Sequence, residues 1–192
     1  MQCISGAGNG SGRAYAGGES VWCGVRWHEG GEAELASSWI LHHLQEEPAL
    51  PPHTLHLVPK TVVLGIGCKR GTEAESIRAL IRETLEQNQI FKESICLIAS
   101  IDLKKDEEGI RICAEELGVP FVTWSAEELE QVRSEDGFTE SAFVRSVAGV
   151  GNVCERSALK GAGTSRLLIR KTAHNGVTVA AAVKDYTVCM ED

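Results

Sequence analysis

The sequence predicts an α/β fold with three layers, in which helices cover both faces of a mostly parallel sheet and a C-terminal β-hairpin makes the sheet mixed. Two observations predict it. Between residues 61 and 130, short β-branched runs alternate with segments whose apolar residues recur at helical spacing, which is the order of βαβ units. Further on, Asn175-Gly176 separates two β-rich runs, and this dipeptide favours a tight hairpin because both residues tolerate positive φ.

The parallel strands are expected at residues 61–66, 95–101 and 120–124, which are short and largely apolar, as strands buried on both faces are. Apolar side chains at helical spacing predict one helix after the first strand and another after the second. They are Ile77, Leu80, Ile81 and Leu85 in the first helix, and Ile110, Cys113, Ala114 and Leu117 in the second, which Gly118 ends.

Polar residues predict where the helices begin. Thr72 with Glu75, and Ser125 with Glu128, have the spacing of a capping box, in which a hydroxyl and a carboxylate accept from opposite backbone amides. Asp106 is expected to cap the second helix. The remaining expected elements are two short helices over 141–148 and 153–159, the latter capped by Asn152, and hairpin strands over 166–172 and 177–184.

Composition divides the chain near residue 58. Residues 1–58 form a Gly/Pro-rich N-terminal segment, with a short helix expected over 32–45 and a strand over 55–58, whereas residues 59–192 carry the regular α/β pattern. The histidines of the first segment lack the spacing of metal ligands and are expected at the surface, so no metal site is predicted. Those considered as ligands are His42, His43, His53 and His56, and His28 is the fifth histidine of the segment.

Charge and composition exclude several classes of protein. The net charge of −8 argues against general nucleic-acid binding, which needs a basic surface, although it leaves a local basic patch open. No run approaches the ~18–20 apolar residues of a membrane span, and the start of the chain does not resemble a signal peptide. Seven cysteines without a CxxC pair indicate reduced thiols, so a cytoplasmic location is expected.

Two polar loops, residues 67–72 and 100–107, follow the first two strands. Ligands of an open parallel sheet bind beyond the carboxyl ends of its strands, and the first loop also leads into a helix N-terminus that favours anions. This rim is therefore expected to bind a ligand with several carboxylates or phosphates. The alternative is that its lysines are solvated and its acids are helix caps. Its residues include Gly67, Cys68, Lys69, Arg70, Gly71, Thr72, Ser100, Asp102, Lys104, Lys105 and Glu107.

A nucleotide-binding domain is an alternative reading of the same loops. The glycines at positions 65, 67 and 71 have GxGxxxG rather than GxGxxG spacing, and no GK[ST] follows, so this is not a Walker loop. Asp102 nevertheless ends the second strand, where an acid that binds a ribose would lie in a dinucleotide fold.

Two further residues are candidates for chemistry. Cys68 lies next to Lys69 and near a helix start, features that lower a thiol pKa, so it is either a nucleophile or a small residue packed under the turn. A Cys-His pair with Cys68 would need His174, the one histidine after residue 60, and the place of this residue at the hairpin turn is expected to keep it away from the rim. Glu155 is expected mainly as a helix cap, and becomes a candidate acid or base if its helix start faces the rim.

Three motifs carry a resemblance to a known family: Gly65-Ile-Gly-Cys-Lys-Arg-Gly-Thr72, Ala99-Ser-Ile-Asp-Leu-Lys-Lys-Asp-Glu107, and Gly151-Asn-Val-Cys-Glu155 with Ala158-Leu159. The segment from Leu57 to Val188 resembles the C-terminal domain of the CbiG family of cobalamin biosynthesis, the cobalt-precorrin-5A hydrolases, and is similar to the related CobE. The resemblance implies an α/β three-layer domain. It also implies that residues 1–58 are the remnant of a central CbiG region.

The resemblance implies a substrate, a cobalt-precorrin tetrapyrrole with many carboxylates, and a reaction that opens its δ-lactone and releases acetaldehyde. No further cofactor is expected because the substrate carries the cobalt, and any partners would be other cobalamin-pathway enzymes. Asp102 or Glu155 would activate water, and Lys69, Arg70 or loop amides would stabilise the oxyanion. The alternatives are a CobE-like tetrapyrrole-binding module without catalysis and a partner-dependent subunit.

Overall fold

The computed structural model describes residues 13–16, 19–22, 24–26, 56–135 and 137–185. A five-stranded sheet in the order β7-β6-β5-β9-β8 forms its centre. The strands are β5 (Val62–Cys68), β6 (Ile95–Ile101), β7 (Phe121–Trp124), β8 (Leu167–His174) and β9 (Val177–Val183). β5, β6 and β7 are parallel, whereas β9 runs antiparallel to β5 and β8 antiparallel to β9. The predicted mixed sheet is confirmed.

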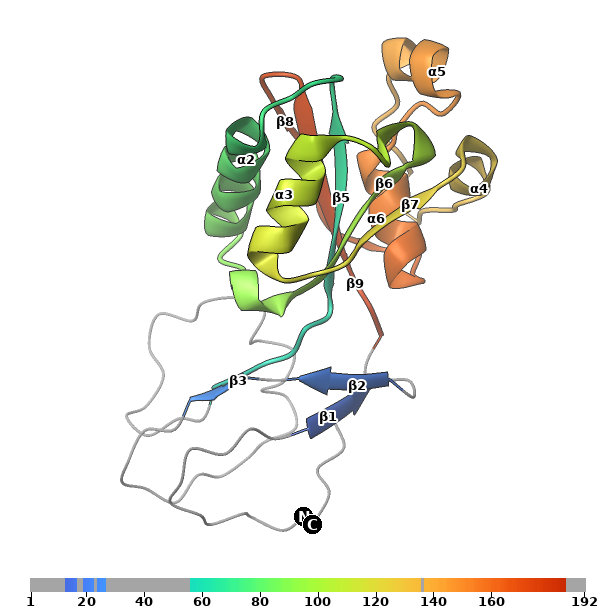
Figure 1. Ribbon diagram of the computed structural model, residues 1–192. Helices are drawn as coiled ribbons and strands as arrows, with labels where there is room; N and C mark the ends of the chain where they lie inside the picture. Colours follow the sequence, from blue (N-terminus) through green and yellow to red (C-terminus); the bar gives the residue numbers. More distant parts are fainter. Residues whose placement is uncertain (1–12, 17–18, 23, 27–55, 136, 186–192) are drawn as a thin grey trace.

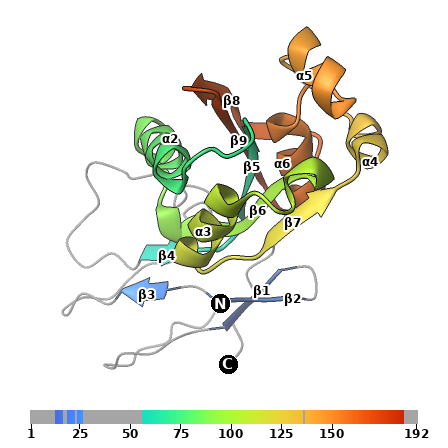
Figure 2. The same cartoon turned by 45° about the horizontal axis from the view of Figure 1, so that its top comes forward.

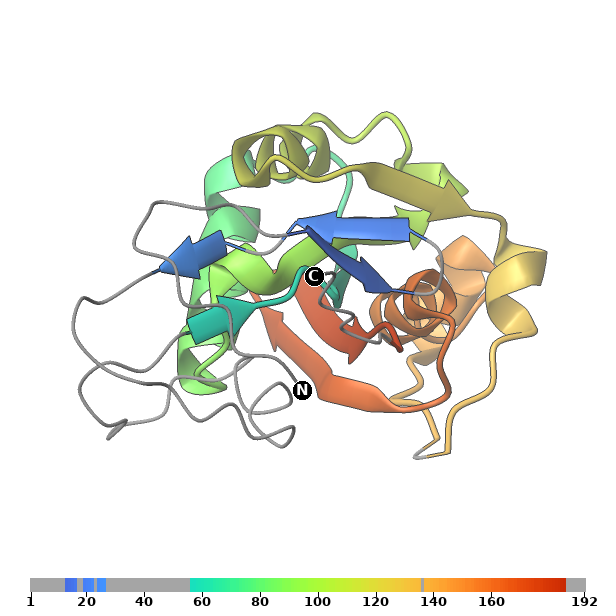
Figure 3. The same cartoon turned by 90° about the horizontal axis from the view of Figure 1, so that it is seen from below.

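Helices lie on both faces of this sheet (Figures 1 and 3). One face carries α2 (Ala74–Gln87) and α3 (Glu108–Leu117). The other carries α6 (Cys154–Ala162), with α4 (Ala126–Glu130) and α5 (Ala142–Ala148) beside it. Among the described residues, no helix is long and apolar enough to cross a bilayer.

Two two-stranded antiparallel pairs precede the large sheet: β1 (Arg13–Ala16) with β2 (Glu19–Trp22), and β3 (Gly24–Arg26) with β4 (His56–Val58). β4 falls within the strand expected over 55–58. The helix expected over 32–45, together with His42, His43 and His53, lies outside the described residues.

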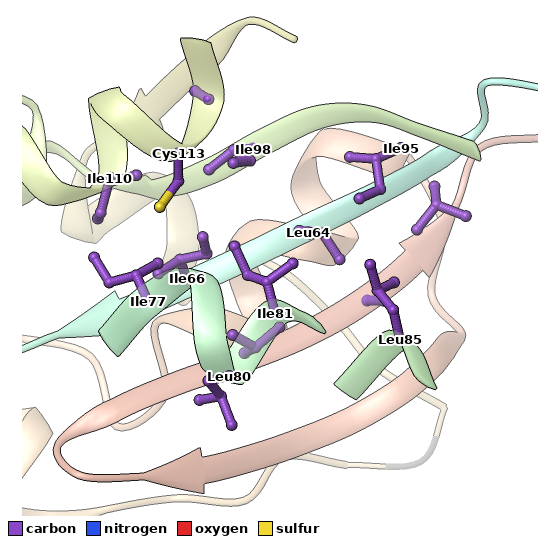
Figure 4. Close-up of a cluster of buried hydrophobic side chains, with 14 of the residues drawn as sticks. Leu64, Ile66, Ile77, Leu80, Ile81, Leu85, Ile95, Ile98, Ile110 and Cys113 are labelled. Carbon is purple, nitrogen blue, oxygen red and sulfur yellow. The ribbon is translucent and has the colours of Figure 1, made fainter. Parts of the chain in front are cut away.

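The core under α2 and α3 is built from the side chains that the helical spacing predicted (Figure 4). Ile77, Leu80 and Ile81 of α2 are nearly inaccessible and pack with Leu64 and Ile66 of β5. Burying one such aliphatic side chain contributes about 1.5–3 kcal/mol. The amphipathic face of α2 thus fixes the helix on the sheet and fixes where its N-terminal loop lies.

The capping predictions were partly wrong. The hydroxyl of Thr72 donates to the carbonyl of Lys69 (2.7 Å), and α2 begins after Glu73 with no side-chain cap, so the expected Thr72 box does not form. Asp106 does not cap α3 either, because Glu107 is the residue that precedes the helix. Ser125 and Glu128 do form the predicted capping box on α4. At α6, the side-chain oxygen of Asn152 accepts from the amide of Glu155 (2.9 Å), as expected.

The C-terminal hairpin is confirmed at its predicted turn. Asn175 and Gly176 have φ values of 48° and 81°, in the left-handed region that this tight turn requires. Val177, the first residue of β9, pairs with His174 on one side and with Cys68, the last residue of β5, on the other. The hairpin turn therefore lies at the carboxyl end of β5.

Candidate functional site at the carboxyl edge of the sheet

Three segments meet beyond the carboxyl ends of the parallel strands (Figures 1 and 2). They are the connections 69–73 and 102–107 and the hairpin turn 174–176, which together are called the rim below. The expectation that the hairpin keeps His174 away from the rim was wrong. Because β9 is antiparallel to β5, the turn before β9 necessarily lies where β5 ends.

A buried carboxylate joins the first two segments. Glu107 accepts a hydrogen bond of 2.6 Å from the backbone amide of Gly71, 36 residues away, through its Oε1. Its Oε2 pairs with the ammonium of Lys104 at 3.0 Å, and the two side chains are only 8% and 15% exposed. The two polar loops thus meet, as the sequence predicted, and an ion pair lies at their junction.

The environment of Glu107 keeps it ionised. Burial by itself raises the pKa of this carboxyl, but the hydrogen bond from Lys104 and the amides of Gly71 and Thr72 stabilise the charged form. Their combined effect holds the pKa of Glu107 below its ordinary value. The negative charge therefore persists at neutral pH and keeps Lys104 in place.

The remaining charged rim residues are exposed: Lys69, Arg70, Glu73, Asp102, Lys105 and Asp106. Lys69 lies towards the hairpin, since its amide donates to the carbonyl of Gly176 (3.2 Å) and its side chain lies against that glycine. The pKa of Glu127, in the first turn of α4, is lowered by hydrogen bonds with its own backbone amide and with the Ser125 side chain, and the negative charge of Asp102 acts in the opposite direction. Asp102 therefore lies towards α4. Lys69 and Asp102 therefore share one edge but lie towards different ends of it.

Two of the predicted ligand-binding residues have structural contacts instead of exposed polar groups. Ser100 is fully buried in β6, and its hydroxyl donates to the carbonyl of Ile66 in β5 (2.7 Å). The carbonyl of Gly67 accepts from the hydroxyl of Thr178 in β9 (3.1 Å). Both residues hold neighbouring strands in register beneath the rim.

The structure places Cys68 at the junction as well, but as a protonated thiol. Burial raises the pKa of Cys68. The ammonium of Lys104 and the hydroxyl of Thr72 act in the opposite direction, and Glu107 adds to the increase. The expectation of a lowered thiol pKa was therefore wrong, because desolvation outweighs the neighbouring cation.

Glu155 lies in the first turn of α6, near the rim, but its carboxylate points inward. It is 0% exposed. Thr139 donates to it through both its amide (2.9 Å) and its hydroxyl (3.2 Å), and Asn152 (2.6 Å) and the amide of Lys171 (2.9 Å) donate as well. The carboxylate thus ties α6 to the loop before α5 and to a bulge in β8. The spacing of Asn152 and Glu155 was visible in the sequence, but the donors from distant segments were not.

Arg156, which the sequence reasoning missed, fixes the loop beyond α4. Its guanidinium lies 4.0 Å from the ring centre of Phe138 and bonds Glu140 (2.9 Å) and the carbonyl of Leu129 (3.1 Å). The side chain is only 8% exposed. In the sequence, the one indication of this role is that a charged residue occupies a position of the helix that faces the core.

In the part of the chain that the structure describes, no group of three His, Cys, Asp or Glu side chains is arranged to hold a metal ion.

Comparison with known proteins identifies the domain. The family described as cobalamin synthesis G C-terminus matches residues 62–182. The chain belongs to this family. The three motifs of the family resemblance come together in the fold. Glu107 links residues 65–72 with 99–107, and α6, which begins within 151–155, packs directly on Gly65.

The relatives of this cobalamin synthesis G domain differ in how much of their length the match covers. The cobalt-precorrin-5A hydrolase of Priestia megaterium is 32% identical over 142 residues, which are 74% of this chain and 37% of the relative. That of Salmonella typhimurium is 37% identical over 71% of this chain and 38% of the relative. The chain thus spans well under half the length of these hydrolases. The Sinorhizobium sp protein CobE is 34% identical over 56% of this chain and 70% of CobE.

Solved structures of the family share the fold. The crystal structure of CobE superposes with a TM-score of 0.60 at 31% identity, and the match covers 66% of this chain and 92% of CobE. A cobalamin biosynthesis protein G homolog from Sulfolobus solfataricus superposes with a TM-score of 0.53 at 28% identity, over 74% of this chain and 43% of that one. The chain is therefore homologous to cobalt-precorrin-5A hydrolases and to CobE.

Proposed function

We propose that this chain binds a carboxylate-rich cobalt tetrapyrrole at the rim and takes part in the hydrolysis of cobalt-precorrin-5A, which opens the δ-lactone and releases acetaldehyde. The observation that carries the proposal is the junction of the two motif loops. There, Lys104 is held by Glu107, and the same two loops carry the exposed cations Lys69, Arg70 and Lys105. Such cations bind carboxylates through charge-assisted hydrogen bonds.

The chemistry of lactone hydrolysis assigns roles to the exposed groups. Asp102 is the candidate base, because it is the solvent-exposed carboxylate at the end of β6 and can take a proton from water. The water oxygen attacks the lactone carbonyl, the cations stabilise the oxyanion that forms, and the acyl–oxygen bond breaks to leave a carboxylate and an alcohol on the macrocycle. Acetaldehyde then leaves as this alcohol loses its proton and the carbon–carbon bond to the macrocycle breaks, with the electron pair of that bond taken up by the macrocycle. Glu155 and Cys68 are less suited to direct roles, since one is fully buried and hydrogen-bonded and the other is a protonated thiol.

A non-catalytic module that binds the tetrapyrrole is the second candidate. The observation that favours it is the similarity to CobE, whose crystal structure superposes with a TM-score of 0.60 over 92% of its length. In that case the rim binds the macrocycle and another protein supplies the catalytic groups.

Two measurements separate these functions. The full chain is incubated with cobalt-precorrin-5A and acetaldehyde is assayed, with Asp102→Asn as the matched variant. Acetaldehyde from the wild type and its loss in the variant support the hydrolase. Binding of the tetrapyrrole without acetaldehyde supports the module.

The second measurement is a titration followed by corrinoid absorbance. Cobyrinic acid, which has free carboxylates, is compared with cobinamide, in which the peripheral carboxylates are amidated. Binding of cobyrinic acid in preference to cobinamide supports recognition of carboxylates by the rim. Binding of ATP or NAD without binding of either corrinoid would overturn both functions and favour the nucleotide-binding alternative.

A further inference from the structure

The junction of the two loops contains an acid in a place where a rim built only to attract anions would have none. Glu107 brings a negative charge to within 3.0 Å of the Lys104 ammonium, and therefore offsets part of the attraction that Lys104 offers an anionic ligand. A group that weakens the local field yet is held by two charge-assisted contacts has another task in this site.

The contacts of Glu107 indicate that task. One carboxylate oxygen accepts from Gly71, within the loop that carries Lys69 and Arg70, and the other pairs with Lys104. A lysine has a long flexible stem, and an exposed one samples many rotamers. Here the Lys104 side chain is 15% exposed and its ammonium is fixed by a nearly buried partner, while one of its three N–H donors suffices for the bond to Glu107.

The backbone around Glu107 is also arranged to keep this contact. Gly109, two residues later, lies so close to the connection before α2 that a Cβ there would come within 2.3 Å of the carbonyl of Thr72. The start of α3 and the connection 69–73 are therefore in direct backbone contact, which brings Glu107 against the amide of Gly71.

We propose that Glu107 is a positioning residue: it locks the connection 69–73 to the start of α3 and presents the Lys104 ammonium, with its remaining donors, to one carboxylate or oxyanion of the bound ligand. The inference rests on the proposed function for the identity of the ligand. The lock between Gly71, Glu107 and Lys104 can be tested without any ligand.

Binding of cobyrinic acid to Glu107→Gln distinguishes positioning from simple attraction. The variant makes the rim more positive by one charge, so a rim that acts only through its field binds the polyanion more tightly. Positioning predicts the opposite, a loss of about tenfold in affinity, as expected when a charge-assisted contact is no longer held in place. Glu108→Gln is the matched control, since it makes the same charge change at the next, exposed residue, and it is expected to bind equally well or more tightly.

A double-mutant cycle shows whether Glu107 acts through Lys104. Lys104→Met removes the ammonium and is expected to weaken binding by itself. In that background Glu107→Gln should have little further effect, because the group it positions is absent. Two additive losses, or tighter binding by Glu107→Gln, would overturn the inference.

The lock itself is measured by following the Gly71 amide resonance against pH. An amide hydrogen-bonded to a carboxylate reports its protonation. The Gly71 resonance should titrate below the ordinary glutamate value of about 4.3, and the midpoint should rise in Lys104→Met. A Gly71 amide that does not titrate with Glu107 would overturn the lock. If the lock titrates as expected but the wild type does not bind cobyrinic acid, the proposed function fails and the lock survives.

Discussion

Gly65 of β5 lies directly beneath the backbone of Cys154 in α6: a Cβ on Gly65 would come within 1.8 Å of the Cys154 carbonyl oxygen and 2.7 Å of the Ala158 amide nitrogen. Helix and strand are therefore in backbone contact at this point. The first glycine of the motif 65–72 thus serves the packing of the second helical layer rather than a ligand. The same contact sets the height of the α6 N-terminus relative to the rim.

Gly65→Ala is expected to lower the free energy of unfolding by about 3 kcal/mol or more, because the new methyl group meets backbone atoms that cannot rotate away. Urea unfolding measures the change. Gly163→Ala is the comparison: this glycine has a positive φ and open space around it, so only conformational strain of about 1–2 kcal/mol is expected. Equal effects of the two substitutions would contradict the close packing of α6 on β5.

Glu155→Gln separates a structural carboxylate from a catalytic one. In the variant, the side-chain NH2 group of glutamine faces at least one of the N–H groups that now donate to Glu155, and two donors cannot form a hydrogen bond with each other. A loss of about 2–3 kcal/mol in the free energy of unfolding is therefore expected. If the proposed hydrolysis occurs, the fraction of the variant that remains folded should release acetaldehyde as the wild type does. Unchanged stability with complete loss of acetaldehyde release would instead make Glu155 the catalytic acid or base.

Cys68 is expected to react slowly with iodoacetamide at pH 7, because burial raises the pKa of its thiol and the thiolate is the reacting form. The rate should increase with pH through the alkaline range. Lys104→Met should slow it further, since that ammonium opposes the increase in the Cys68 pKa. Mass spectrometry of the modified peptides gives the rate for this site alone. Fast modification of Cys68 at neutral pH would restore it as a nucleophile.

The stability of the protein should depend on pH through Glu107. Its pKa is lowered in the folded state, so its contribution is present above the unfolded-state value of about 4.3. That contribution is lost as the pH falls through the folded-state pKa. The difference in free energy of unfolding between wild type and Glu107→Gln should therefore be largest near neutral pH and should shrink in acid. A difference independent of pH from 7 to 3 would show that the charge of Glu107 does not stabilise the fold.

Local patterns were sufficient for most of the fold. The strand expected over 95–101 coincides with β6, and the turn at Asn175-Gly176 follows from the φ values that these residues tolerate. Capping was harder to predict because a polar side chain near a helix start has several possible partners. The hydroxyl of Thr72 bonds within its own loop, and the carboxylate of Glu107 bonds a loop 36 residues away.

The rim could be predicted in outline but not in its contacts. The sequence places two polar loops after two strands, and parallel pairing of those strands brings the loops together. Burial of each side chain depends on the whole fold. Ser100 and Glu155 lie beside predicted loops yet are fully buried, and Cys68 is desolvated enough to raise its pKa. The position of His174 at the rim depends on β9 pairing with β5, a contact between segments more than a hundred residues apart.

Charge reversal distinguishes whether the carboxylates of a cobalt tetrapyrrole bind at the rim or elsewhere on the protein. Arg70→Glu with Lys105→Glu reverses two exposed rim cations. Lys60→Glu with Lys92→Glu makes the same change in net charge at the amino ends of β5 and β6. The rim variant is expected to lose affinity for cobyrinic acid by about a hundredfold, while the control variant is expected to bind within about threefold of wild type. Equal affinities of the two variants would contradict binding at the rim.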